Sequence, residues 1–404
     1  MIYIKKQNCL LVMFMISFVM IPAYLSAQKK ESFTVGNITY KVPRAYLEQP
    51  KEIPDFWISE IDPVTEFLYT VVKKGKIEVI GKSVSGRPIR AVTYGTPRGE
   101  KGTSTFSGSL GFRDFSAYRG ADNKKVYMST AAVHGGEFEG IVGMVNLIAI
   151  IETGRDLRGK EWPEVNEVVK KIDRIVLVPI TNPDARARIP VRMLRHWETD
   201  KTALEYLNTG GHADGSITGW PQVKEYIPVD LSRPGFPGGY PNDNGVNLRH
   251  DDFFGSPQPE TRILYDLTSR ERPDLIIDMH TGAVYPNIHA PFNLPFLYPA
   301  FEGLFTQVQG RFNSEGLAVQ KDAKEKIKVP PFKTKDFSLE AALNMNCGAL
   351  SVVFESPSHA FGKMNSKKEI VALTPDQLLD GQIFLHTEAM RFLGESEGLS
   401  QWLQ

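Results

Sequence analysis

Residues 131–140, AAVHGGEFEG, place a histidine and two acids around a pair of glycines, directly after the apolar run KVYMSTAAV. His134 and Glu137 are residue types that bind zinc, and a catalytic zinc site needs three such ligands and one position open for water. The double glycine disfavours a helix between them and permits a turn on which both side chains converge. The spacing alone is a weak signal, because a helix start with Glu137 and Glu139 near its N-terminus explains it equally well.

A third ligand must come from elsewhere in a chain with eight histidines. His280 is the best placed, because it ends the strand-like run PDLIIDMH and ligands in open α/β sheets gather at the carboxyl ends of strands. A hydrogen-bonded turn histidine is the alternative interpretation. His386 falls on the apolar stripe of a predicted C-terminal helix, which indicates a core or interface position. The remaining histidines are weaker candidates by position: His196, His212, His250, His289 and His359.

A zinc hydrolase also needs a base that is not a metal ligand and that can pass a proton to the leaving group. Glu355 ends the apolar run ALSVVFES, and burial at such a strand end would raise the pKa of its carboxyl. A solvated acid at a strand end is the alternative.

Short apolar runs such as KVYMSTAAV, RIVLVPI, DLIIDMH and LSVVFES predict strands that are buried on both faces. They alternate with helical patterns such as GIVGMVNLIAIIETG, which indicates an α/β fold with helices on both sides of a largely parallel or mixed sheet. Residues 204–244 are rich in glycine and proline and predict a long irregular excursion. Excursions of that length in a compact domain tend to shape a site.

The chain has 404 residues, and its 47 basic side chains equal its 47 acidic ones. This balance gives no electrostatic case for a nucleic-acid partner or a membrane surface. Residues 1–27 carry two lysines, a short apolar stretch and then small residues, which predicts a secretory signal and export to the periplasm or outside the cell, without membrane contact after cleavage. An uncleaved anchor is the alternative. We expect one catalytic domain over residues 28–404, with Cys347 as its single cysteine.

Six motifs occur in one order along the chain: GKSVSGRPI, HGGE, TNPDARAR, GVNLRHDDF, DMHTG and FES. Together they resemble the zinc carboxypeptidase family of metallopeptidases over roughly residues 55–390. The resemblance implies a three-layer α/β/α sandwich with a mixed sheet of about eight strands. It also implies one zinc ion per chain, held by His134, Glu137 and His280, with Glu355 as general base and acid.

The substrate-anchoring segment departs from the family pattern GVDLNRNF. Asn247 replaces an aspartate that supports a zinc-ligand histidine, and Arg249 and His250 replace the Asn-Arg pair that binds a terminal carboxylate. An amide still accepts a hydrogen bond from an imidazole, but it supplies no negative charge. Arg249 is expected to bind substrate from a shifted position, with His250 beside it, because a guanidinium binds a carboxylate bidentately and an imidazole does not.

Two further family residues have altered counterparts. No tyrosine lies between Pro330 and Glu355, where the family places one on a mobile loop. The arginine that stabilises the developing oxyanion follows the NPD motif in the family. On spacing, Arg195 is the favoured counterpart and Arg192 is the next candidate, as an oxyanion or substrate contact.

We therefore expect an exported zinc-dependent metallocarboxypeptidase that hydrolyses a peptide bond by Glu355-assisted attack of zinc-bound water. Its expected partner is a peptide or an acyl-amino-acid substrate. The alternatives are an amidase or deacylase that acts on N-acyl amino acids or cell-wall peptides, and a family member that binds peptides without turnover.

Overall fold

The computed structural model describes residues 30–35, 37–99, 105–112, 114, 116–120, 122–195, 202–212, 216–219, 229–231, 235–283, 286–290, 292–317, 337–359, 363–364, 367, 369–371 and 373–402. The predicted signal at residues 1–27 and His196 lie outside these residues. In the part of the chain that is described, every helix is too short or too polar to cross a lipid bilayer.

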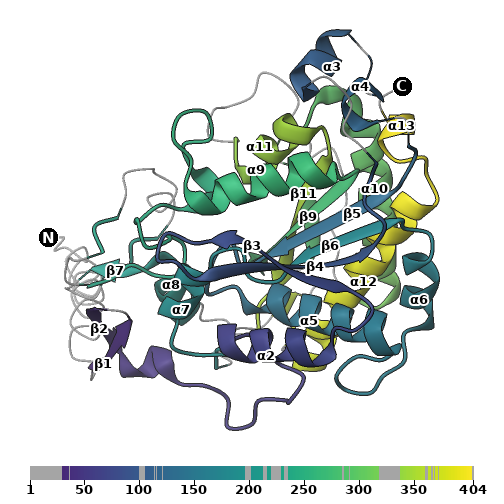
Figure 1. The fold of residues 1–404 in the computed structure, drawn as a ribbon. Helices are drawn as coiled ribbons and strands as arrows, with labels where there is room; N and C mark the ends of the chain where they lie inside the picture. The colour runs from purple at the N-terminus through teal and green to yellow at the C-terminus, as the bar shows by residue number, and fades with distance from the viewer. Residues whose placement is uncertain are drawn as a thin grey trace, which may run out of the picture.

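The centre of the molecule is a twisted seven-stranded sheet in the order β10, β11, β9, β5, β6, β4, β3 (Figure 1). The neighbours β11, β9, β5 and β6 are parallel, whereas β10, β4 and β3 pair antiparallel. The sheet is therefore mixed, as expected, with seven strands in the described residues against about eight predicted. The strands are β3 (Lys76–Lys82), β4 (Pro88–Gly95), β5 (Val126–Ala131), β6 (Arg174–Val178), β9 (Leu275–Ala283), β10 (Asn287–His289) and β11 (Leu350–Pro357).

Helices cover both faces of this sheet, which confirms the α/β/α sandwich (Figure 1). One face carries α2 (Ile61–Val71), α5 (Phe138–Thr153), α6 (Pro163–Val169), α10 (Tyr298–Ser314) and α12 (Pro375–Gly394). The opposite face carries α9 (Pro259–Glu271) and α11 (Leu339–Cys347).

Smaller elements complete the described chain. They are β1 (Lys30–Val35), β2 (Ile38–Pro43), η1 (Arg44–Leu47), α3 (Phe106–Phe112), α4 (Ser116–Arg119), α7 (Pro183–Arg188), α8 (Thr202–Thr209), β7 (Gly211–His212), β8 (Gly235–Phe236), η3 (Leu248–His250), η4 (Pro295–Leu297), β12 (Lys363–Met364), β13 (Ile370–Val371) and α13 (Leu399–Trp402).

Side chains of the central strands alternate between two apolar cores because successive strand residues point to opposite faces. In β9, Ile277 and Met279 pack into the core under α5 and α12, while Ile276 packs into the core under α9 and α11. Asp278 and His280 therefore point to the α11 side of the sheet. In β11, Val352 and Phe354 belong to the α5 and α12 core, so Glu355 also points toward α11.

Helix α12 begins as its sequence predicts. Thr374 caps it, with the Thr374 hydroxyl and the Gln377 side chain forming a reciprocal capping box, and Pro375 lies in the first turn. His386 is fully buried, and its Nδ1 lies 2.8 Å from the hydroxyl oxygen of Tyr127. The prediction of His386 as a core histidine is confirmed.

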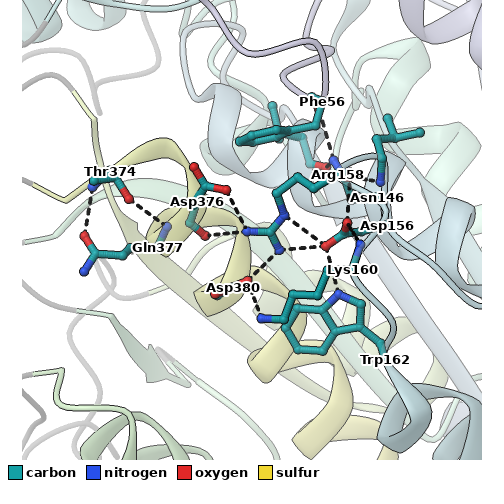
Figure 2. Close-up of polar contacts among 12 residues, drawn as sticks. Phe56, Asn146, Asp156, Arg158, Lys160, Trp162, Thr374, Asp376, Gln377 and Asp380 are labelled. Atoms are coloured by element: carbon teal, nitrogen blue, oxygen red, sulfur yellow. Dashed lines mark hydrogen bonds and ion pairs between the residues drawn. The ribbon is translucent and has the colours of Figure 1, made fainter.

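An ionic cluster fixes the loop between α5 and α6 against the start of α12 (Figure 2). The Arg158 guanidinium lies 2.7 Å from a carboxylate oxygen of Asp156, 3.2 Å from one of Asp376 and 2.5 Å from one of Asp380. The Trp162 indole N–H donates to Asp156 at 2.9 Å. These contacts tie the loop between α5 and α6 to the first turns of α12.

Candidate metal centre and active site

The candidate ligands His134, Glu137 and His280 converge at the carboxyl ends of two neighbouring parallel strands. His134 follows β5, Glu137 is the residue before α5, and His280 lies in β9, which pairs with β5. The Nδ1 atoms of His134 and His280 lie 2.8 and 2.9 Å from the two carboxylate oxygens of Glu137. The three side chains are buried, and their ligand atoms lie within 4.8 Å of one another.

The outer nitrogen of each imidazole has its own acceptor. His134 Nε2 lies 3.2 Å from the amide oxygen of Asn247, and His280 Nε2 lies 2.8 Å from a carboxylate oxygen of Asp278. The Thr130 hydroxyl in turn donates to Asp278 at 2.6 Å. Such acceptors fix the tautomer and orientation of a ligating histidine and leave Nδ1 for a metal ion. Asn247 thus stands in the supporting position with an amide in place of a carboxylate.

The donor set of this cluster fits zinc. Two imidazole nitrogens and one carboxylate are the ligands of a catalytic zinc site with an open fourth position. Burial opposes the charge on Glu137, but His134 and His280 outweigh it and lower the pKa of the carboxyl to about 2. Glu137 is therefore an anion, the form in which a carboxylate binds a metal ion.

A second group of three possible ligand side chains lies next to the first and shares His280 with it: Asp278, His280 and Glu340. A fixed cation already occupies this neighbourhood, because Nε of Arg249 lies 3.5 Å from Oε1 of Glu340. A metal ion here would be repelled by the guanidinium. The first cluster is therefore the candidate metal centre.

The two glycines of the HGGE turn lie against closely packed atoms, which are backbone atoms at Gly135 and a side chain at Gly136. A Cβ atom at Gly135 would lie 2.2 Å from the carbonyl carbon of Ala185 in α7, and one at Gly136 would lie 2.1 Å from Oδ1 of Asn208. The Gly135 N–H also donates to the carbonyl of Gly239 at 2.6 Å. The glycine-rich excursion predicted from the sequence therefore packs directly against the turn that carries the ligands.

Glu355 lies near the carboxyl end of β11, beside His280 of the candidate metal centre. It pairs in register with His280 of β9 on one side and with Asn287 of β10 on the other. Its side chain is 22% exposed, and burial raises the pKa of its carboxyl although His280 and Arg249 oppose the rise. The acid predicted to end an apolar strand is thus partly buried and in register with His280.

Arg249 lies between two carboxylates. Its Nε is 3.5 Å from Glu340 and one Nη is 3.6 Å from Glu355. The Glu340 side chain is fully buried, accepts a hydrogen bond from the Ser338 hydroxyl, and lies 3.6 Å from Nε2 of His280. Sequence reasoning missed Glu340, because an acid in the first turn of a helix normally indicates a solvated helix start. Its only signal is an acid inside the otherwise apolar run LEAAL.

Comparison with known families shows to which family the chain belongs. The profile of the zinc carboxypeptidase family matches residues 73–315, which include His134, Glu137, Arg249 and His280. This chain belongs to the zinc carboxypeptidase family. The enzyme is therefore a zinc metallopeptidase of the carboxypeptidase type, and zinc is its cofactor. Glu340 and Glu355 lie beyond the matched residues.

Solved structures share the fold of this carboxypeptidase at low sequence identity. A metallo-carboxypeptidase from Burkholderia cenocepacia is 16% identical with a TM-score of 0.50, over 90% of this chain and 76% of that one. A metallo-carboxypeptidase from Pseudomonas aeruginosa, in complex with (2-guanidinoethylmercapto)succinic acid, is 12% identical with a TM-score of 0.51, over 95% and 83%. A search of curated protein sequences finds no match.

The three remaining predicted site residues of this carboxypeptidase differ from one another in burial and in their contacts. His250 is buried in η3, directly after Arg249. Arg192 is exposed, and its carbonyl accepts hydrogen bonds from Trp57 and Ser59. The Arg195 side chain is 52% exposed and forms an ion pair with Glu48. The roles of these three residues stay predictions.

Two other arginines of the TNPDARAR motif are structural. Arg186 is buried and donates to the carbonyls of Ser59, Ile189 and Val191. Arg188 is also buried and donates to carbonyls of the excursion and to Asp243 at 2.6 Å. These guanidiniums are fully used within the protein, so neither is available to a substrate.

Proposed function

We propose that this zinc carboxypeptidase family member hydrolyses a peptide bond at a zinc ion held by His134, Glu137 and His280, with Glu355 as general base and acid. The convergence of the two Nδ1 atoms on Glu137, one strand away from Glu355, carries this proposal. Zinc bound there would polarise the scissile carbonyl and lower the pKa of a water molecule.

Glu355 is suited to move the proton. As a carboxylate it accepts a proton from the attacking water, and as an acid it delivers that proton to the leaving nitrogen. Burial raises the pKa of its carboxyl, which makes it a stronger base than a solvated glutamate. Because Glu355 and His280 are in-register neighbours on parallel strands, the sheet itself fixes the base relative to the metal centre.

The substrate is a peptide in this proposal, with N-acyl amino acids and cell-wall peptides as the alternative class. We assign oxyanion stabilisation to Arg195 on its spacing from the NPD motif, with Arg192 as the next candidate. Arg195 would have to exchange Glu48 for substrate to take that role, and its half-exposed position permits the exchange. Arg249 and His250 are the proposed substrate neighbours from η3.

We also propose that residues 1–27 direct export and are removed. N-terminal sequencing of the protein recovered from the periplasm or medium tests this. A mature N-terminus near residue 28 is expected, and an intact Met1 on all secreted material would contradict cleavage.

The decisive experiment compares Glu355→Gln with the wild type and with Glu66→Gln, an exposed acid on α2 that serves as the matched control. Each protein is assayed for zinc content and for hydrolysis of a peptide library. We expect bound zinc in all three proteins and a loss of about 10²- to 10⁴-fold in kcat for Glu355→Gln alone, as for a general base. Full activity of Glu355→Gln, or a wild type that binds no zinc, would sink the proposal.

A further inference from the structure

The positive charge of the Arg249 guanidinium is balanced by carboxylates of the protein itself. Glu340 lies against its Nε and Glu355 against one Nη, at 3.5 and 3.6 Å. Only 13% of the Arg249 side chain is exposed, and none of the Glu340 side chain is. The charge that could bind a carboxylate therefore faces two acidic side chains of the enzyme before any substrate arrives.

A terminal carboxylate that approached Arg249 would meet this environment as a whole. Its attraction to the guanidinium would be offset by repulsion from two carboxylates at similar distances, whereas its attraction to the zinc ion of the proposed function does not depend on Arg249. Glu340 is held in place on its other oxygen by the Ser338 hydroxyl, and it lies in the first turn of helix α11. If Glu340 moved away from the guanidinium, a buried charge would lose its ion-pair partner, which is costly.

Building on the proposed hydrolase function, we propose that Glu340 is a specificity-determining residue that occupies Arg249 and removes the requirement for a free C-terminal carboxylate. The substrate class that follows is peptides and amides whose C-terminal end is neutral or extended, cleaved alongside free acids. Glu340 acts here through Arg249 and takes no part in proton transfer. Because Glu340 also lies 3.6 Å from Nε2 of the zinc ligand His280, zinc content is measured in every variant to separate the two effects.

The test uses matched N-acetyl dipeptides that end in a free carboxylate or in a carboxamide. In the wild type we expect kcat/KM values for the acid and the amide within about tenfold of each other. In Glu340→Gln the guanidinium loses one anionic partner, so the acid-to-amide ratio should rise at least tenfold, through a lower KM for the acid. A wild type that prefers the acid more than 100-fold, or a Glu340→Gln ratio equal to that of the wild type, would overturn the proposal.

A double variant, Arg249→Gln with Glu340→Gln, removes the ion pair without a change in net charge. If Arg249 does not anchor the substrate, its acid-to-amide ratio stays at the wild-type value. If Arg249 does anchor the substrate, the acid-to-amide ratio of the double variant should instead fall below the wild-type value. The double variant also keeps the test valid if Glu340→Gln alone fails to fold.

A binding measurement separates this proposal from the proposed hydrolysis. Calorimetry on the zinc-loaded proteins compares N-acetylphenylalanine with its amide. Glu340 faces His280 as well as Arg249, so the affinity for the amide provides the reference in each protein, and the change in the acid relative to the amide reports the guanidinium. Absence of turnover across the peptide library would refute the hydrolase function, while an affinity for the acid that rises at least tenfold in Glu340→Gln would still support the role of Glu340.

Discussion

The ring of Tyr240 lies flat against the imidazole of His134, with a centroid distance of 3.7 Å and an interplanar angle of 13°. Tyr240 belongs to the glycine-rich excursion, whose Gly239 carbonyl also accepts the Gly135 N–H at 2.6 Å. Asn247 fixes one edge of the same imidazole. His134 is therefore held on a face and on an edge by residues about a hundred positions later in the chain, and we infer that the excursion preorganises this zinc ligand.

Replacement of Tyr240 tests this inference. Tyr240→Ala removes the stacked ring, and we expect the zinc affinity to fall about 10- to 100-fold, as for other residues that orient metal ligands. Tyr240→Phe keeps the stacked face and should retain most of the affinity. Competition with a chromophoric chelator measures both values. Equal affinities for the alanine variant and the wild type would contradict a positioning role.

The residues that could be found from the sequence are those whose local pattern places them. His280 and Glu355 each end or nearly end an apolar strand, and parallel strands bring their carboxyl ends to one edge of the sheet. The HGGE turn was ambiguous by itself and became interpretable through the ordered motifs around it. Helix α12 and its buried His386 followed from capping residues and apolar spacing.

Tyr240 and Glu340 could not be found in this way, because their surroundings depend on tertiary contacts. Tyr240 reaches His134 only through the path of the excursion, and Glu340 reaches Arg249 only because α11 packs beside η3. In the sequence, Tyr240 is an aromatic residue in a glycine-rich turn, and Glu340 is an acid at the start of a helix. The glycines of HGGE were predicted to permit a turn, and the structure adds that they permit close packing against α7 and Asn208.

The buried His386 predicts a distinct acid sensitivity of the fold. Burial lowers the pKa of its imidazole from 6.5 to about 3. The unfolded chain gains a proton at this residue as the pH falls through 6.5, whereas the folded protein does so only near pH 3. Above pH 6.5, His386 therefore does not reduce the free energy of unfolding. As the pH falls toward 3, protonation of this residue in the unfolded chain lowers that free energy by up to about 1.4 kcal/mol per pH unit and about 5 kcal/mol in all.

Urea unfolding of the wild type and His386→Gln between pH 7 and pH 4 measures this contribution. Glutamine retains a side chain able to hydrogen bond with the Tyr127 hydroxyl but does not titrate. We expect the stability difference between the two proteins to narrow or reverse as the pH falls, because other titrating groups are common to both. Parallel pH profiles would show that the imidazole is protonated equally in both states.

A methyl group at Gly135 should damage both the fold and the metal centre. The Cβ atom would lie 2.2 Å from the Ala185 carbonyl carbon and 2.3 Å from the Arg186 nitrogen, so backbone rather than a flexible side chain must move. Overpacking of this kind costs about 1–3 kcal/mol. Because α7 or the HGGE turn must shift to relieve it, Gly135→Ala should also weaken zinc binding.

Gly310 in α10 provides the matched control, since a Cβ there meets no atom within 4 Å. Gly310→Ala should raise stability by about 0.5–1 kcal/mol through helix propensity and leave zinc affinity unchanged. Thermal unfolding with and without zinc, together with chelator competition, distinguishes the two; a Gly135→Ala protein as stable and as tightly zinc-binding as Gly310→Ala would refute the close packing.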